Sequence, residues 1–418
     1  MPAQKNIDSN PCALESYDYV LPSRLIASYP ANPRESARLL IYNRTNEQIT
    51  HTSFENLLDF IPRDTTIVLN DTRVIKARIY GKRVLTTHKN SDKNIGGKRE
   101  ILFHRFITKQ EILQEYFIKA NTKSKQDFDI ESSLDSISDI SVDSSGLEGQ
   151  KFYALCQTKG KLKNGDKIIL KQGYEAHIIA TLANSAISNA FTNGYKIIVF
   201  TKDCKALLQA QVIEMLESIG EIPLPPYIKR KISAIDEIQY QTLIASKSGS
   251  IAAPTASLHF SQAMLKELKS RFKTATVTLH IGAGTFAPVV ASDIRNHTMH
   301  KEMLNISPNA IKSIQNANKI LCVGSSSMRS VECLAQALKN NPSMSLDKGF
   351  ETQCDIFLHP QNPPIKTDFL LTNFHLPKST LIMLVASMVG CEKWRKIYKE
   401  AIEKQYRFYS YGDAMLVL

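Results

Sequence analysis

The β-branched apolar run Thr65-Thr66-Ile67-Val68-Leu69-Asn70 predicts a buried strand, and the domain organisation follows from where this strand finds its partners. The chain after it changes in texture. From about residue 74 to residue 200, short strand-like runs alternate with turn signals such as Asn164-Gly165, and no long amphipathic helix intervenes. This pattern is typical of a small β-barrel or sandwich. The strand over 65–70 finds no partner of its kind there, so we expect its partners later in the chain.

Strand, turn and helix alternate after about residue 201. Such alternation predicts an α/β domain with a parallel sheet. The expected strands cover 275–280, 319–323 and 367–374, and the expected helices cover about 328–339 and the run that starts near residue 378.

The α/β domain is therefore predicted to be discontinuous, with a small β-barrel domain inserted in it. We expect a mobile tail over 1–12, the first α/β segment over 13–72, the barrel domain over 73–201 and the second α/β segment over 202–418. Residues 121–150 contain eight serines and few bulky side chains, so we expect a flexible loop within the barrel domain.

Charge is unevenly distributed along the chain. The formal net charge is +12, but residues 121–150 hold two lysines and seven acids, so the other residues together carry +17. A folded body that basic favours a polyanionic partner. Many soluble proteins are basic without binding nucleic acid, so the charge alone leaves both interpretations open.

The same survey argues against other classes of protein. The longest apolar run, residues 381–389, is about half of what spans a bilayer, and no secretory signal precedes the first block, so we expect a cytoplasmic protein without membrane contact. The seven cysteines include no C-x-x-C pair, which argues against a zinc ribbon. His300 and Glu302 have the H-x-E spacing of zinc deaminases, but the P-C-x-x-C element is missing, so no metal is expected.

Polar and small residues follow each expected parallel strand, where ligands of open α/β sheets bind. We therefore expect Asp71, Thr285, Arg329 and His375 to line one cleft. Each exit also has a purely structural interpretation: a turn closed by its own side chains, glycines needed for packing, or a capped helix start. A helix start beside His375 and Lys378 would also suit a carboxylate or phosphate.

Seven motifs occur in one order along the chain. They are L-N-D-T-R-V from Leu69, I-P-L-P-P-Y-I from Ile222, A-A-P-T-A-S-L-H-F from Ala252, T-L-H-I-G-A-G-T-F from Thr278, V-G-S-S-S-M-R-S from Val323, L-T-N-F-H-L-P-K-S-T from Leu371 and Y-R-F-Y-S-Y-G-D-A-M from Tyr406. Together they closely resemble the S-adenosylmethionine:tRNA ribosyltransferase-isomerase family of queuosine biosynthesis. Ser257, Ser325, Ser326 and Tyr409 are mild departures from the family pattern, and residues 361–364 differ from its glycine-containing turn.

The resemblance implies a transferase-isomerase that needs no metal or prosthetic group and consumes S-adenosylmethionine as a co-substrate. The implied partner is a tRNA with 7-aminomethyl-7-deazaguanine at the wobble position, and the products are epoxyqueuosine, adenine and methionine. We expect the protein to act as a monomer. The alternatives are an ordinary methyltransferase and a catalytically inert tRNA-binding protein. The methyltransferase would show a glycine fingerprint after its first strand.

The matching motifs also supply the candidate site residues. Four could move protons, with no role assigned to any one of them: His375, His259, Asp71 and Asp413. Candidates for substrate binding are Asn70, Arg73, Thr255, His280, Gly282, Gly284, Thr285, Ser326, Arg329, Asn373, Lys378, Ser379, Thr380, Tyr406 and Arg407. The basic run Lys229, Arg230 and Lys231 is the candidate contact for RNA phosphates, although a solvated connector would look the same.

Overall fold

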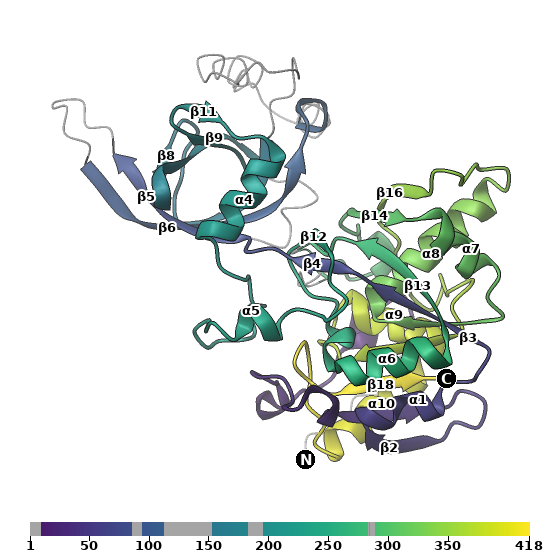
Figure 1. Cartoon of the computed structure of the whole chain (residues 1–418). Helices are drawn as coiled ribbons and strands as arrows, with labels where there is room; N and C mark the ends of the chain where they lie inside the picture. The colour runs from purple at the N-terminus through teal and green to yellow at the C-terminus, as the bar shows by residue number, and fades with distance from the viewer. Residues whose placement is uncertain (1–9, 86–93, 113–152, 183–194, 283, 285–288) are drawn as a thin grey trace. The chain divides into compact units, whose positions relative to one another are not determined.

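The computed structural model describes residues 10–85, 94–112, 153–182, 195–282, 284 and 289–418. They form two compact units (Figure 1). The first combines the chain up to Val74 with Leu224–Leu418, and the second is Ile75–Pro223. The discontinuous α/β domain predicted from the sequence is confirmed.

A nine-stranded sheet is the centre of the first unit, in the order β16-β14-β13-β3-β15-β17-β18-β1-β2. The strands are β1 (Arg38–Tyr42), β2 (Ile49–Ser53), β3 (Thr65–Asn70), β13 (Lys273–Leu279), β14 (Glu302–Ile306), β15 (Lys319–Val323), β16 (Phe350–Cys354), β17 (Phe369–Asn373) and β18 (Ala414–Val417). β3 lies between β13 and β15 and is parallel to both, and β17 continues the parallel set. The strand over 65–70 thus finds its partners in the second half of the chain, as predicted.

Helices cover both faces of this sheet, and alternate residues of β3 explain why. Val68 packs into one core, and Ile67 and Leu69 pack into the other. A strand that is buried on both faces reads as a continuous apolar run, which is what the sequence has here. The helices on the Val68 face are α7 (Pro308–Gln315), α8 (Ser325–Asn340), α9 (Thr380–Val389) and α10 (Cys391–Glu403). Those on the other face are α1 (Leu57–Phe60) and α6 (Gln262–Arg271).

The second unit is a β-barrel. Its strands are β5 (Arg78–Leu85), β6 (Asn94–Ile107), β7 (Tyr153–Lys159), β8 (Lys167–Ile169), β9 (Tyr174–Leu182), β10 (Tyr195–Lys202) and β11 (Lys205–Ala206). Six of them form the ring β10-β7-β6-β5-β8-β9, which the antiparallel pairing of β9 with β10 closes. Helix α4 (Gln209–Ile219) belongs to the same unit. The predicted inserted barrel is therefore confirmed, whereas the predicted loop over 121–150 lies outside the described residues.

Three further findings concern local structure. Residues 1–9 of the expected tail lie outside the described residues, but Cys12 is buried and its carbonyl accepts a hydrogen bond from Ile294. Helix α8 begins at Ser325, three residues before the predicted start, directly after Gly324 with its φ of 91°. No helix within the described residues is long and apolar enough to cross a membrane.

Candidate active site

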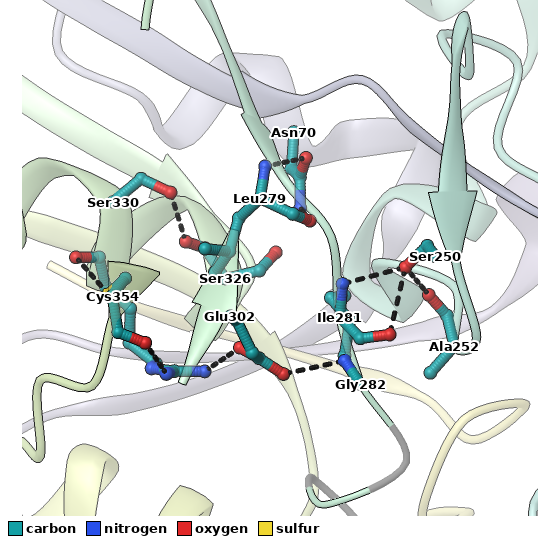
Figure 2. Close-up of polar contacts among 11 residues, drawn as sticks. Asn70, Ser250, Ala252, Leu279, Ile281, Gly282, Glu302, Ser326, Ser330 and Cys354 are labelled. Atoms are coloured by element: carbon teal, nitrogen blue, oxygen red, sulfur yellow. Dashed lines mark hydrogen bonds and ion pairs between the residues drawn. The ribbon is translucent and has the colours of Figure 1, made fainter. Parts of the chain in front are cut away.

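The parallel strands β13, β3, β15 and β17 all end at one edge of the sheet, and Asn70 fastens two of those ends together. Its side-chain amide donates to the carbonyl of Leu279 at 3.0 Å and accepts from the Leu279 amide at 3.1 Å (Figure 2). The segment that follows β13 is held by Ser250. The Ser250 hydroxyl accepts a hydrogen bond from Ile281 N at 2.9 Å and donates one to the Ala252 carbonyl at 2.7 Å. These bonds fix the course of the chain where β13 ends.

A buried carboxylate lies just beyond this point. Glu302 accepts a hydrogen bond from Gly282 N at 2.8 Å, and its other oxygen forms an ion pair with Arg329 (Figure 2). Arg329 also lies 3.5 Å from the Cys354 carbonyl through Nη2. Burial lowers the pKa of Arg329, but the charge and hydrogen bond of Glu302, together with Cys354 and Cys333, raise the pKa above its ordinary value. Arg329 therefore stays protonated inside the protein.

A small cleft opens beside this ion pair. Glu302 and Arg329 form part of its polar wall, together with His297 and His300. The apolar part of the wall comes from Met299, Phe357 and the first turns of α9. A cleft of this kind, mostly apolar with a few convergent polar groups, is the usual form of a small-molecule site.

Both histidines of the cleft are neutral at pH 7. Burial lowers the pKa of His300, with a smaller lowering from Arg329 and an opposing effect from Glu302. Burial, with His300 nearby, also lowers the pKa of His297. Gly284 packs so closely on His300 that a Cβ at Gly284 would lie 2.2 Å from the ring carbon Cδ2. A neutral imidazole in a fixed orientation can accept a proton from a bound ligand.

Three of the predicted substrate-binding residues, Gly284, Arg329 and Thr380, line the cleft, and Gly282 holds its carboxylate. Thr285 lies outside the described residues. Asp71 and His375 are not among the lining residues. Of the four residues expected to share a cleft, Arg329 is the one among those described that lines this cleft.

Asp71 and His280 both form side-chain hydrogen bonds near the end of β3. Asp71 accepts from Thr278 Oγ1 at 2.6 Å and from Ser246 Oγ at 3.0 Å. The Nδ1 atom of His280 lies 2.8 Å from Thr72 Oγ1, and burial lowers the pKa of its ring. Arg73, the last predicted residue of this exit, is exposed.

His259 and His375 lie beside β17 and are buried. The amide nitrogen of Asn373 is 3.2 Å from His259 Nε2, and Asn373 accepts from Thr255 Oγ1 at 2.8 Å. Thr372 Oγ1 is 2.9 Å from His375 Nε2. Burial lowers the pKa of each imidazole to about 3, with Arg407 adding to the effect at His259. Both rings are therefore neutral members of the packed interior.

Asp413 organises the end of the C-terminal motif. It is 1% exposed and accepts hydrogen bonds from the backbone of Arg38 at 3.2 Å and of Arg407 at 2.8 Å. The guanidinium of Arg407 pairs with the same carboxylate at 3.0 Å. Tyr406 is buried, with Arg38 above its ring. The partners of the carboxylate thus come from its own loop and from the start of β1.

Lys378 faces acids of the N-terminal segment, since its ammonium group lies 2.8 Å from Glu15 and 3.1 Å from Asp18. Ser379 caps α9 by accepting from Ile382 N at 3.4 Å. The hydroxyl of Ser326, in the first turn of α8, is buried without a hydrogen-bond partner among the described residues. The purely structural interpretation, a capped helix start, thus describes what the Ser379 side chain does.

The three residues of the predicted RNA-binding run differ in their surroundings. Lys229 and Lys231 are exposed. Arg230 instead forms an ion pair with Asp236, which is fully buried, and donates to the Ser28 carbonyl at 2.9 Å. Its guanidinium is occupied within the first unit.

A family model described as queuosine biosynthesis protein matches residues 14–417. The chain belongs to this family. An S-adenosylmethionine:tRNA ribosyltransferase-isomerase of Helicobacter pylori (strain ATCC 700392 / 26695) is 44% identical over 406 residues, which are 97% of this chain and 99% of the relative. Proteins of the same name from Helicobacter acinonychis and Helicobacter hepaticus are each 43% identical, over 97% and 99% of this chain and 99% and 98% of the relatives.

A solved structure is also similar to this family member. The S-adenosylmethionine tRNA ribosyltransferase of Thermotoga maritima shares 22% identity, with a TM-score of 0.46 over 96% of this chain and 100% of that one.

Sequence reasoning missed nine lining residues of the cleft as site candidates, namely His297, Met299, His300, Glu302, Ile356, Phe357, Leu358, Leu381 and Leu384. A signal for Glu302 was present. In β14 the buried positions are Glu302, Leu304 and Ile306, so a carboxylate occupies a position of the apolar face of an alternating strand. A charge on that face requires a buried partner, here Arg329. The H-x-E spacing was weighed only as a metal motif. Among the described residues no group of three His, Cys, Asp or Glu side chains could hold a metal ion.

Proposed function

We propose that this chain transfers the ribosyl part of S-adenosylmethionine to 7-aminomethyl-7-deazaguanine at the tRNA wobble position and isomerises it. The products are epoxyqueuosine, adenine and methionine, and no prosthetic group takes part. The protein acts as a monomer in the cytoplasm, where its tRNA is found. The support is membership in the queuosine biosynthesis family, together with relatives over 40% identical that are named S-adenosylmethionine:tRNA ribosyltransferase-isomerase.

The cleft beside Glu302 is the proposed donor site. The reaction removes a proton from the ribose carbon next to the sulfonium, and the departing adenine needs a proton in turn. His300 is the group we assign to the first task, because it is neutral and faces the cleft. Phe357 offers an aromatic face to the sulfonium, and Met299 and Leu381 offer apolar surface to the rest of the donor. The observation that most supports this cleft as the donor site is that the neutral imidazole of His300 and the buried Glu302–Arg329 ion pair line it together.

Gly282, Gly284, Arg329 and Thr380 contribute to this site in the proposal. The other predicted groups have a different role. His259, His375 and Asp413 are buried and hydrogen-bonded, so we assign them to holding the sheet edge in shape. Asp71, half-buried and bound to two hydroxyls, is the predicted proton-transfer group that keeps a path to solvent.

The test is a product assay. The protein is incubated with S-adenosylmethionine and tRNA that carries the precursor base, and small molecules are identified by mass spectrometry. Adenine with methionine supports the proposal. S-adenosylhomocysteine would instead indicate a methyltransferase, and no product would indicate a protein that only binds tRNA.

Paired variants test the site itself. His300→Gln should lower turnover by about a hundredfold or more, since a general base contributes roughly that much. His297→Gln is the matched control on the same loop and should keep turnover within a fewfold. Equal turnover in both variants would remove His300 from the proposed role.

A further inference from the structure

The described strands at the start of the barrel unit carry an excess of basic residues. Between Lys76 and Lys171 the described residues include thirteen lysines and arginines but only three acids. Each acid already has a basic partner: Glu100 pairs with Lys159 at 3.0 Å, Asp166 with Arg83 at 2.6 Å and Glu111 with Arg105 at 3.0 Å. Over the whole stretch from Lys76 to Lys171, which includes the acidic residues 121–150, lysines and arginines outnumber acids by 19 to 12.

Strands β5 and β6 direct part of that charge outward. Ile79 and Ile101 are opposite each other in the register and fully buried, so they face the barrel interior. Because side chains alternate along a strand, Tyr80 and Lys82 on β5 project from the outer face, as does Lys98 on β6. The two strands are labelled in Figure 1. We call Tyr80, Lys82 and Lys98 the basic hairpin face.

Two like charges are direct neighbours on the basic hairpin face. Lys82 and Lys98 are register partners, and both are exposed. Side chains opposite each other in an antiparallel pair have Cβ atoms about 5 Å apart, so two ammonium groups there repel each other. No acidic side chain among the described residues forms an ion pair with either lysine. A bound anion would remove this repulsion.

An aromatic ring is part of the same face. The ammonium group of Lys98 lies 3.8 Å from the centre of the Tyr80 ring, and the ring is partly exposed. Lysines that neutralise phosphates beside a ring on which a base can stack are the usual elements of a surface for single-stranded nucleic acid. A free phosphate would use the lysines but not the ring.

We propose that the basic hairpin face binds the RNA backbone of the tRNA substrate, with Lys82 and Lys98 at phosphates. When Lys98 turns from the Tyr80 ring to a phosphate, the ring face becomes free for an unstacked base. The choice of tRNA rests on the proposed function. The surface lies wholly on the barrel unit, so it would recognise RNA by contacts of its own. Lys82 and Lys98 thereby replace Arg230, whose guanidinium is occupied by Asp236.

The experiment measures equilibrium binding of unmodified tRNA to the full chain over a range of salt concentrations. Lys82→Gln with Lys98→Gln should weaken binding about tenfold at moderate salt and reduce the slope of log affinity against log salt by about two. Lys266→Gln with Lys269→Gln, two exposed lysines of α6, is the matched control and should leave affinity and slope unchanged. Tyr80→Leu should weaken binding severalfold without changing the slope.

Thermal melting separates this proposal from a structural role. Loss of the Lys82–Lys98 repulsion should leave the double variant as stable as the parent or more stable, whereas a structural role would lower its melting temperature. Unchanged tRNA affinity in the double variant would overturn the inference. So would loss of binding to anionic phosphatidylserine vesicles with tRNA binding intact, because that result would indicate a membrane contact. The readout is binding, so a failed product assay would contradict the proposed function without touching this result.

Discussion

Arg329 and Glu302 form an ion pair in which the two residues are only 6% and 4% exposed, and the pair joins helix α8 to strand β14 at the wall of the cleft. The same two side chains reach Gly282 and the Cys354 carbonyl, so four segments of the chain meet there. The Nε atom of Arg329 has no hydrogen-bond partner among the described residues. An isolated buried charge at this position would be costly, which makes the pair a single unit in energetic terms.

Breaking the Glu302–Arg329 ion pair should destabilise the first unit of the protein. Glu302→Gln and Arg329→Gln should each cost about 3–5 kcal/mol, because each leaves one buried charge without its partner. The double variant should cost clearly less than the two single costs together, since no unpaired charge remains. Trp394 is the only tryptophan and is fully buried in this unit, so its fluorescence during urea unfolding reports the free energy. Additive costs would contradict the prediction.

Two neighbouring glycines give a matched test of the cleft geometry. A Cβ at Gly284 would lie 2.2 Å from the His300 ring, so Gly284→Ala must displace that ring. At Gly282 the nearest atom to such a Cβ is a Glu302 oxygen at 3.8 Å, so Gly282→Ala should fit. We expect Gly284→Ala to lower kcat by about tenfold to a hundredfold, since misplacing a reacting group by about 1 Å has that effect. Gly282→Ala should keep kcat, and an equal loss in both variants would argue against a role for the His300 orientation.

His259 and His375 should make the protein sensitive to acid. Their folded pKa values of about 3 lie below the ordinary value of 6.5, so the unfolded chain binds more protons between those pH values. Their contribution to stability is complete above pH 6.5 and is lost as the pH falls from 6.5 towards 3, by roughly 1 kcal/mol per pH unit for each histidine. Unfolding measured at several pH values checks the slope. His375→Gln should be less stable at neutral pH but less dependent on pH, with near-normal turnover of the folded fraction.

Asp413 should prove structural. Asp413→Asn removes the charge that holds Arg407 and weakens the hydrogen bonds to two backbone amides, at a cost of about 1–3 kcal/mol. Turnover per folded molecule should change little. Measuring melting temperature and kcat on the same preparation separates the two effects. A stable Asp413→Asn protein with turnover lowered a hundredfold would return Asp413 to the catalytic candidates.

The fold was accessible to sequence reasoning because β3 has a local signature. An uninterrupted apolar run such as residues 65–70 occurs where a strand is buried on both faces, and its lack of partners nearby indicated a discontinuous domain. The edge at which ligands bind follows from the direction of parallel strands. Gly284 and Arg329 could therefore be predicted from the sequence as site residues.

The role of single polar residues was not accessible in the same way. His375 and Asp413 stand in motifs as distinctive as that of Arg329, yet their burial depends on Tyr398 and Arg407 and on how the last segment folds back. Conversely, His300 and Glu302 lie after a long loop and matter because β14 brings them beside α8. Such proximity comes from tertiary packing, which residue spacing does not encode.

The pH dependence of turnover should identify His300 as the proton acceptor. A base must be neutral to act, and the pKa of His300 lies below its ordinary value of 6.5 because of burial. The acid limb of kcat/KM should therefore fall below pH 6.5, so that activity is nearly constant from pH 7 down to about that value. Gly284→Ala should shift the limb, because it moves the ring out of its buried setting, whereas His375→Gln should leave the limb in place. Turnover is measured over minutes, within the pH range in which Trp394 fluorescence shows the protein to be folded. A limb that persists unchanged in His300→Gln would assign the proton transfer to another group, and Asp71, with its path to solvent, would be the next to replace.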